Sequence, residues 1–202
     1  MQDEFIYRTI PKRSEGIYKE KGSKFLSFAI PVSDERDIRE ELAALRKQYH
    51  DARHHCFAYR VGTEKTEYRL SDDGEPPGTA GKPIYRQLLA RDLTNVLLVI
   101  VRYFGGTKLG TSGLIRAYRS ASSDALNKTR IVTRRIEESY RIHFGFDQMD
   151  PVMRIIRQNK MTIKSQRYDN ECSMEVKIWK KKLHNVLKDL EWLSGVTIEK
   201  AI

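Results

Sequence analysis

The chain has 202 residues, of which 40% are hydrophobic and 32% are charged, a composition typical of a soluble globular protein with one or two domains. Its 37 lysine and arginine residues outnumber its 27 aspartate and glutamate residues, and the resulting net charge of +10 favours polyanionic partners. The longest uncharged run, residues 93–101, is far shorter than the roughly 20 residues that span a bilayer, so we expect a cytoplasmic protein without a membrane segment.

Alternating strand and helix patterns fill the first part of the chain. Residues 24–32 are rich in apolar and aromatic side chains and predict a strand. Ser33 or Asp34 can then cap a helix whose apolar residues recur at helical spacing up to about residue 49. Further strands are predicted over residues 54–61 and 67–70, followed by a helix from about Pro83 that should bury Ile84, Leu88 and Leu89.

Residues 95–104 are apolar almost throughout, which predicts a central strand buried on both faces. Thr111 or Ser112 should cap the helix that follows, and this helix should run to about Asn127. Its expected inward stripe consists of Leu114, Ile115, Tyr118, Ala121 and Ala125.

The second part of the chain has a different order of predicted elements. Strands are predicted over residues 139–146, 161–168, 172–179 and 196–200, helices over 149–158 and 183–193, and a hairpin turn at Asp169-Asn170. This order is βαββαβ, the ferredoxin-like arrangement. We therefore predict an α+β protein with an N-terminal domain over residues 1–135 and a ferredoxin-like domain over residues 136–202. Residues 1–135 hold 25 basic and 17 acidic residues, so most of the excess charge belongs to the first domain.

A glycine-rich segment lies between the buried strand and its following helix, and it contains Gly105, Gly106 and Gly110. Backbone N–H groups in such a position can bind anions. Basic side chains flank the segment: Arg102, Lys108, Arg116 and Arg119. A P-loop would require lysine where the chain has Thr111, so nucleotide hydrolysis is not indicated. The alternative is that the glycines only permit a tight turn.

An acidic loop precedes that segment and places Asp72, Asp73 and Glu75 within four residues. These carboxylates could hold Mg²⁺, accept hydrogen bonds from bases, or pair with arginines. With His54, His55 and Lys82 they form a candidate second part of the site. Each histidine is more simply a structural residue, and no spacing indicates a zinc site, a resident cofactor or a catalytic residue.

The two cysteines, Cys56 and Cys172, belong to no disulfide or metal-binding pattern. We predict that both are reduced and packed in the interior. A catalytic thiol at Cys56, beside the two histidines, is the alternative.

Residues 52–56 (ARHHC), 71–83 (SDDGEPPGTAGKP) and 101–114 (VRYFGGTKLGTSGL) together resemble the YigZ and IMPACT family of the bacterial two-domain type. The resemblance implies a two-layer α/β first domain, similar to the second domain of a small-subunit ribosomal protein and to domain IV of elongation factor G. It also implies a second domain similar to domain V of that factor. Eukaryotic relatives are similar in the first domain only, and they regulate translation through protein contacts that restrain a stress-activated initiation-factor kinase.

The net positive charge, the glycine-rich segment and the family resemblance together predict a non-enzymatic protein that binds RNA or the ribosome and regulates translation. Two alternatives remain open. One is an enzyme that uses Mg²⁺ on a phosphate-bearing substrate, and the other is a regulator that binds a protein partner without touching nucleic acid.

Overall fold

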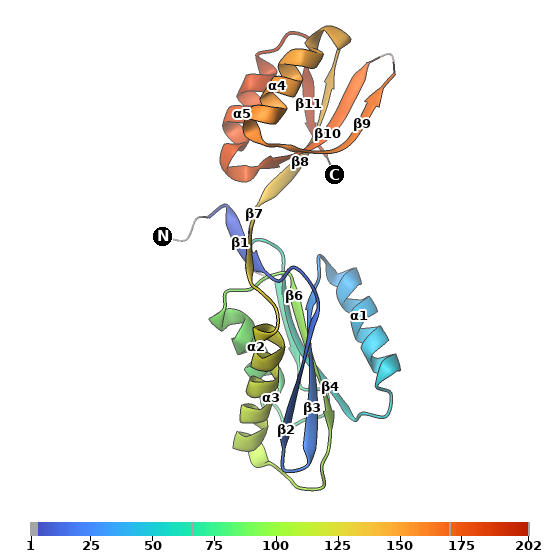
Figure 1. Ribbon diagram of the computed structural model, residues 1–202, viewed down its shortest axis with the longest axis vertical. Helices are drawn as coiled ribbons and strands as arrows, with labels where there is room; N and C mark the ends of the chain where they lie inside the picture. The colour runs from blue at the N-terminus through green and yellow to red at the C-terminus, as the bar shows by residue number, and fades with distance from the viewer. Residues whose placement is uncertain (1–3, 66, 170, 202) are drawn as a thin grey trace. The chain divides into compact units, whose positions relative to one another are not determined.

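The computed structural model describes residues 4–65, 67–169 and 171–201. The chain divides into two compact units (Figure 1). The N-terminal unit comprises residues 7–134, and the C-terminal unit comprises residues from Arg135 onward together with the segment that ends at Ile6. A short sheet pairs β1 (Ile6–Thr9) with β7 (Val132–Arg135).

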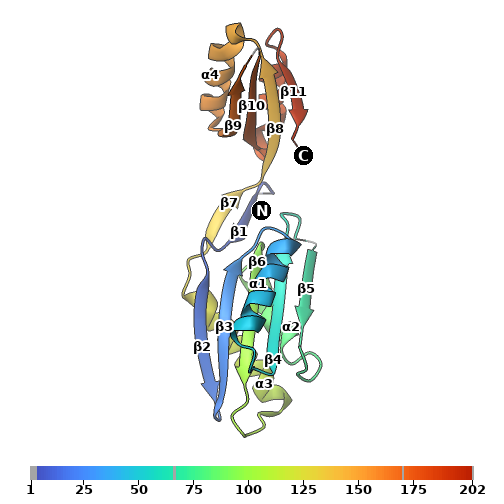
Figure 2. The same ribbon diagram turned by 90° about the vertical axis from the view of Figure 1, so that its right-hand side faces the viewer.

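The N-terminal unit is built on an antiparallel five-stranded sheet with the order β2-β3-β6-β4-β5. Its strands are β2 (Ser14–Glu20), β3 (Ser23–Pro31), β4 (His54–Val61), β5 (Glu67–Ser71) and β6 (Val96–Tyr103). Helix α1 (Glu35–Gln48) covers one face, while α2 (Gly81–Ala90) and α3 (Gly110–Asn127) cover the other (Figure 2).

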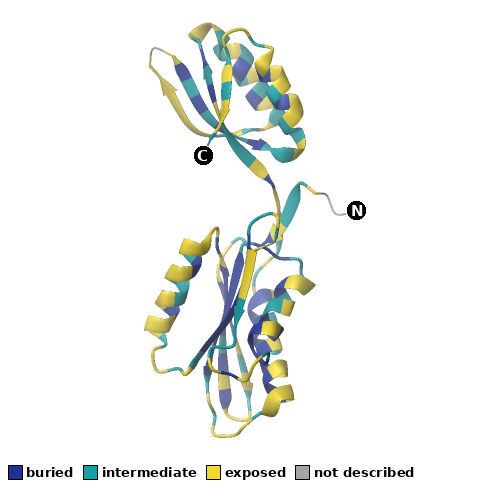
Figure 3. Ribbon diagram, turned by 180° about the vertical axis from the view of Figure 1, so that it is seen from behind, coloured by how far each residue is buried: buried dark blue, intermediate teal, exposed yellow. Residues whose placement is uncertain are grey.

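The expected two-layer arrangement is therefore wrong, because the sheet has helices on both faces. The central strand β6 explains this: Leu98 and Ile100 pack toward α2 and α3, whereas Leu97 and Val99 pack toward α1. Figure 3 shows the buried residues along the strands and on the helix sides that face them. A strand that is apolar on both sides needs a cover on both sides.

Several predicted elements agree with the structure, and some details do not. Asp34 caps α1 as predicted, accepting from the N–H groups of Arg36 and Asp37. Helix α3, however, begins at Gly110 and has no side-chain cap, so the predicted cap by Thr111 or Ser112 is wrong. Leu89 and Ile115, expected to be buried, are exposed because each lies beside rather than on the apolar stripe of its helix.

The C-terminal unit is an antiparallel sheet with the order β11-β8-β10-β9. Its elements are β8 (Glu137–Phe144), α4 (Met149–Asn159), β9 (Thr162–Tyr168), β10 (Cys172–Trp179), α5 (Leu183–Glu191) and β11 (Thr197–Lys200), with short 3-10 helices over 146–148 and 180–182. The predicted βαββαβ order is present. Both helices pack on one face around Val152, Ile156, Val186 and Leu190. Asn170 of the predicted hairpin turn lies outside the described residues.

No helix in the described part of the chain is long and apolar enough to cross a membrane. Cys56 and Cys172 are both free and buried, as predicted.

Candidate functional site

The glycine-rich segment joins the end of β6 to the start of α3, and two of its glycines have positive φ angles: +86° at Gly106 and +70° at Gly110. Gly105 meets a different requirement. It packs directly on Gly22, in the turn between β2 and β3, and its N–H donates to Ser23 Oγ at 3.2 Å. A β-carbon on Gly105 would overlap the Gly22 and Ser23 backbones. The backbone itself therefore explains why glycine occupies these positions.

An aromatic side chain that sequence reasoning missed projects from this segment. Phe104 is 52% exposed, and the Arg102 guanidinium lies 5.7 Å from the centre of its ring. The exposed Lys108 follows in the same segment, and the first turn of α3 has no side-chain cap. We call Phe104, Gly106, Lys108 and the first turn of α3 the glycine-loop surface.

The four flanking basic residues fall into two groups. Arg102 is only 6% exposed and forms a 2.6 Å ion pair with Glu75, and Arg116 pairs with Glu20 at 2.5 Å. Lys108 and Arg119 are exposed and form no ion pair with any described residue. Arg102 is therefore held in a buried pair, whereas Arg116 is 61% exposed beside Glu20, and of the four only Lys108 and Arg119 carry a charge that no described carboxylate pairs.

A buried polar network lies beneath the glycine-loop surface and joins α3 to the acidic loop and to β6. Tyr118, on α3, donates to Glu75 Oε1 at 2.7 Å, and the Cys56 thiol lies 3.3 Å from the Tyr118 hydroxyl. Arg102 also lies 3.5 Å from Ser23 Oγ and stacks on Phe25. Burial raises the pKa of the Cys56 thiol far above its usual range, so this sulfur stays protonated. A catalytic thiol at this position is therefore disfavoured.

The acidic loop is tied to the protein by its own carboxylates. Asp72 accepts hydrogen bonds from the N–H groups of Gly78, Ala80 and Gly81, which makes it the cap of α2. Asp73 accepts from the N–H of His55 at 2.7 Å and from Arg46 at 3.0 Å. Since Glu75 is held by Arg102, all three carboxylates already have protein donors.

The two histidines also bind the acidic loop rather than facing an open cleft. The ring of His54 contacts the Asp73 carbonyl oxygen through Nδ1 at 2.9 Å. His55 is 6% exposed, and burial lowers its pKa despite the nearby Asp73 carboxylate, so the ring stays neutral at physiological pH. Within the described residues, no group of three histidine, cysteine or acidic side chains is placed to hold a metal ion. Lys82 is exposed at the start of α2.

Replacing Asp72 with alanine should lower the free energy of unfolding by about 1–2 kcal/mol, the usual cost of a lost helix cap. Burial raises the pKa of Asp72, but the three backbone donors and Lys82 outweigh this effect, and its pKa is lowered from 3.8. The stabilisation is therefore complete above pH 3.8 and is lost as pH falls through the lower, folded-state pKa. Urea unfolding of both proteins across this pH range should show their difference shrinking in acid; a difference that grows would contradict the assignment.

Comparison with known proteins gives consistent matches over most of the chain. The Impact N-terminal domain matches residues 21–126. The IMPACT family member YvyE of Bacillus subtilis (strain 168) is 30% identical over 191 residues, covering 95% of this chain and 87% of the relative. The IMPACT family member YigZ of Escherichia coli (strain K12) is 32% identical over 140 residues, covering 68% of this chain and 69% of the relative. A crystal structure of a hypothetical protein aligns with a TM-score of 0.73 at 25% identity, covering 98% of both chains.

Proposed function

This chain belongs to the IMPACT family, and from that premise we propose that it is a non-enzymatic, cytoplasmic protein that binds RNA or the ribosome and regulates translation. The observation that carries the proposal is the glycine-loop surface. There an exposed aromatic ring, an unpaired lysine and the uncapped start of an 18-residue helix lie within one short stretch of chain. Phosphate groups suit the helix start and the lysine, and a base can stack on the ring.

The net charge of the N-terminal part also supports a nucleic-acid partner, because residues 1–135 contain 25 basic residues and 17 acidic ones. The alternative of a Mg²⁺-dependent enzyme has weaker support. Its candidate carboxylates, Asp72, Asp73 and Glu75, are each held by protein donors, so binding a metal ion would first require breaking those hydrogen bonds.

The test compares the wild type with a Phe104→Ala, Lys108→Gln, Arg119→Gln variant, which changes two residues of the glycine-loop surface and the unpaired arginine farther along α3. Affinity for single-stranded RNA should fall at least about tenfold, because base–aromatic stacking contributes roughly 1–3 kcal/mol and removal of the two charges weakens binding to phosphates. The slope of log affinity against log salt should also decrease, by about 0.7 for each phosphate of the single strand that the variant no longer neutralises. Fluorescence anisotropy with labelled RNA and co-sedimentation with ribosomes, both across a salt series, measure these effects.

A matched control removes the same charge from the other face of the sheet. Arg36 and Lys47 are exposed on α1, and the Arg36→Gln, Lys47→Gln variant should retain wild-type affinity within about twofold, since non-specific charge effects on exposed sites are small at moderate salt. Equal losses in both variants would mean that net charge, not this surface, causes binding. Ribosome association that survives nuclease treatment and all these substitutions would instead favour a protein partner.

A further inference from the structure

The strand register of the C-terminal unit brings three separate connections to one end of it. Residue pairs Phe144–Cys172, Cys172–Tyr168 and His143–Thr197 lie side by side at the ends of their strands. The connections that begin or finish there are residues 145–148, the β9–β10 hairpin, of which Asp169 and Glu171 are described, and residues 192–196; Figure 1 shows the strand and helix ends that they join at the same end of this unit.

This end exposes large aromatic side chains. Trp192 is 80% exposed, Phe146 is 58% exposed and Tyr168 is 46% exposed. Every large hydrophobic residue found exposed among the described residues of this unit lies at this end. Scattered apolar residues are normal on a protein surface, but three exposed aromatic rings at one end of a small unit mark a candidate interaction site.

The same end is acidic, although the protein as a whole carries a net charge of +10. The acidic residues in these connections and in the adjoining helix turns are Asp147, Asp150, Asp169, Glu171, Asp189 and Glu191, while Arg167 in β9 and Lys188 in the last turn of α5 are the adjacent basic residues. At the opposite end of this unit, the two corresponding connections carry Lys160 and the run from Lys180 to Lys182.

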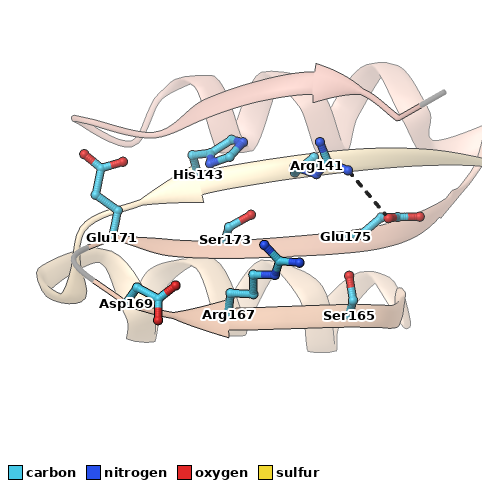
Figure 4. A pocket seen from close by; sticks show the side chains of 8 residues that line it. All are labelled: Arg141, His143, Ser165, Arg167, Asp169, Glu171, Ser173 and Glu175. Atoms are coloured by element: carbon cyan, nitrogen blue, oxygen red, sulfur yellow. Dashed lines mark ion pairs between the residues drawn. The ribbon is translucent and has the colours of Figure 1, made fainter.

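None of these six carboxylates forms an ion pair within the described part of the chain. By contrast, Glu175, on the face of the sheet that no helix covers, pairs with Arg141 and with Lys164. Figure 4 shows this face, with Asp169 and Glu171 at the edge of a hollow of about 460 Å³. Three carboxylates elsewhere on the sheet, Glu138, Glu175 and Glu199, therefore have ion-pair partners, whereas those at the aromatic end do not.

Helix stability accounts for only some of the acidic residues. Asp147 and Asp150 lie at the start of α4, where negative charge interacts favourably with the helix dipole. Asp189 and Glu191 lie in the last turn of α5, where negative charge is unfavourable and only Lys188 supplies the favourable positive charge. Acidic residues that oppose the local helix preference, beside a tryptophan that is 80% exposed, indicate a role outside folding.

We propose that this end of the C-terminal unit docks a protein segment that is rich in lysine or arginine and presents apolar side chains between them. The aromatic rings would bury apolar side chains, and the unpaired carboxylates would supply opposite charge at the rim. RNA and anionic membranes fit this end poorly, because six carboxylates would repel their phosphates. The proposal stands whether or not the N-terminal unit binds RNA.

The test uses the full-length protein and a labelled amphipathic peptide of lysine and leucine, followed by fluorescence anisotropy. Trp192→Ala, and separately Asp189→Asn with Glu191→Gln, should each weaken peptide binding about tenfold, the scale of an interface hot spot. Two matched controls lie in the N-terminal unit: Tyr68→Ala, whose ring is 56% exposed, and Glu40→Gln with Glu67→Gln, both exposed. Both controls should bind the peptide as the wild type does.

The matching peptide of glutamate and leucine should not bind. Failure of the wild type to bind the lysine peptide, or equal losses in the control variants, would overturn the proposal. Sedimentation measures whether the wild type self-associates. Self-association that Trp192→Ala abolishes would also overturn the proposal, because the occupant of this end would then be a second copy of the chain. RNA affinity lowered by Trp192→Ala would likewise assign this end to nucleic acid.

Discussion

Replacing Glu75 with leucine is expected to lower the free energy of unfolding by about 3–5 kcal/mol, the cost of leaving one charge of a buried pair alone in the interior. Arg102 would be that charge: it is 6% exposed, and its 2.6 Å contact with Glu75 is its ion pair. The substitution also removes the acceptor of the Tyr118 hydroxyl, which is fully buried. Urea unfolding followed by circular dichroism measures the change.

Two controls separate the unpaired charge from lost packing. The double variant Glu75→Leu, Arg102→Met should regain most of the stability, because apolar residues of similar volume often replace a buried ion pair at little cost. Glu35→Ala breaks the exposed pair between Glu35 and Arg39, so it should cost at most about 0.5 kcal/mol. A Glu75→Leu variant no less stable than Glu35→Ala would refute the assignment of this pair as a structural anchor.

Features that depend on neighbouring residues could be predicted from the sequence. The helix over Glu35–Gln48 follows from a cap and an apolar spacing that lie within one segment, and the strand over Val96–Tyr103 follows from an uninterrupted apolar run. The βαββαβ order of the C-terminal unit similarly follows from local periodicity and turn residues. Each of these patterns requires only a dozen or so adjacent residues to be recognised.

Features that depend on strand register could not be predicted. Sequence reasoning left open that the acidic loop pairs with arginines, but it assigned Arg102 to an anion site and could not say which arginine meets which carboxylate; the fold pairs Glu75 with Arg102 in the interior. Sequence reasoning also missed Asp72 as the cap of α2, because the capped N–H groups lie up to nine residues away, at Gly81. The Glu75–Arg102 pair has no local pattern because it depends on how the acidic loop meets β6, and the contacts of Asp72 depend on how the loop folds back on the start of α2.

The strand β2 was missed for a related reason. Its segment, Ser14–Glu20, contains Gly16 and several charged residues, a composition that does not favour a strand. The fold requires glycine at this position because α3 passes very close to it, with Asp124 and Ala125 occupying the space of a side chain. Asp124 also accepts from the N–H of Ile17 at 2.8 Å, which satisfies a donor on this sheet edge.

Replacing Gly105 with alanine should lower the free energy of unfolding by about 3 kcal/mol, at the upper end of the usual cost of overpacking. Its β-carbon would overlap backbone atoms of Gly22 and Ser23, and a backbone cannot move aside as a flexible side chain can. Either the turn between β2 and β3 or the start of the glycine-rich segment must shift. Because Phe104 adjoins Gly105, the shift should also reduce the RNA affinity that we propose for this surface, which anisotropy measures beside urea unfolding.

Gly106 provides the matched comparison, because it is the next residue and has open space around its α-carbon. Its φ angle of +86° is unfavourable for alanine, so Gly106→Ala should cost about 1–2 kcal/mol from backbone strain alone. If Gly105→Ala were as stable as Gly106→Ala, close packing on Gly22 could not be what positions this segment. A larger loss at Gly105, accompanied by weaker RNA binding, would show that the packing between two distant turns holds the glycine-loop surface in its binding conformation.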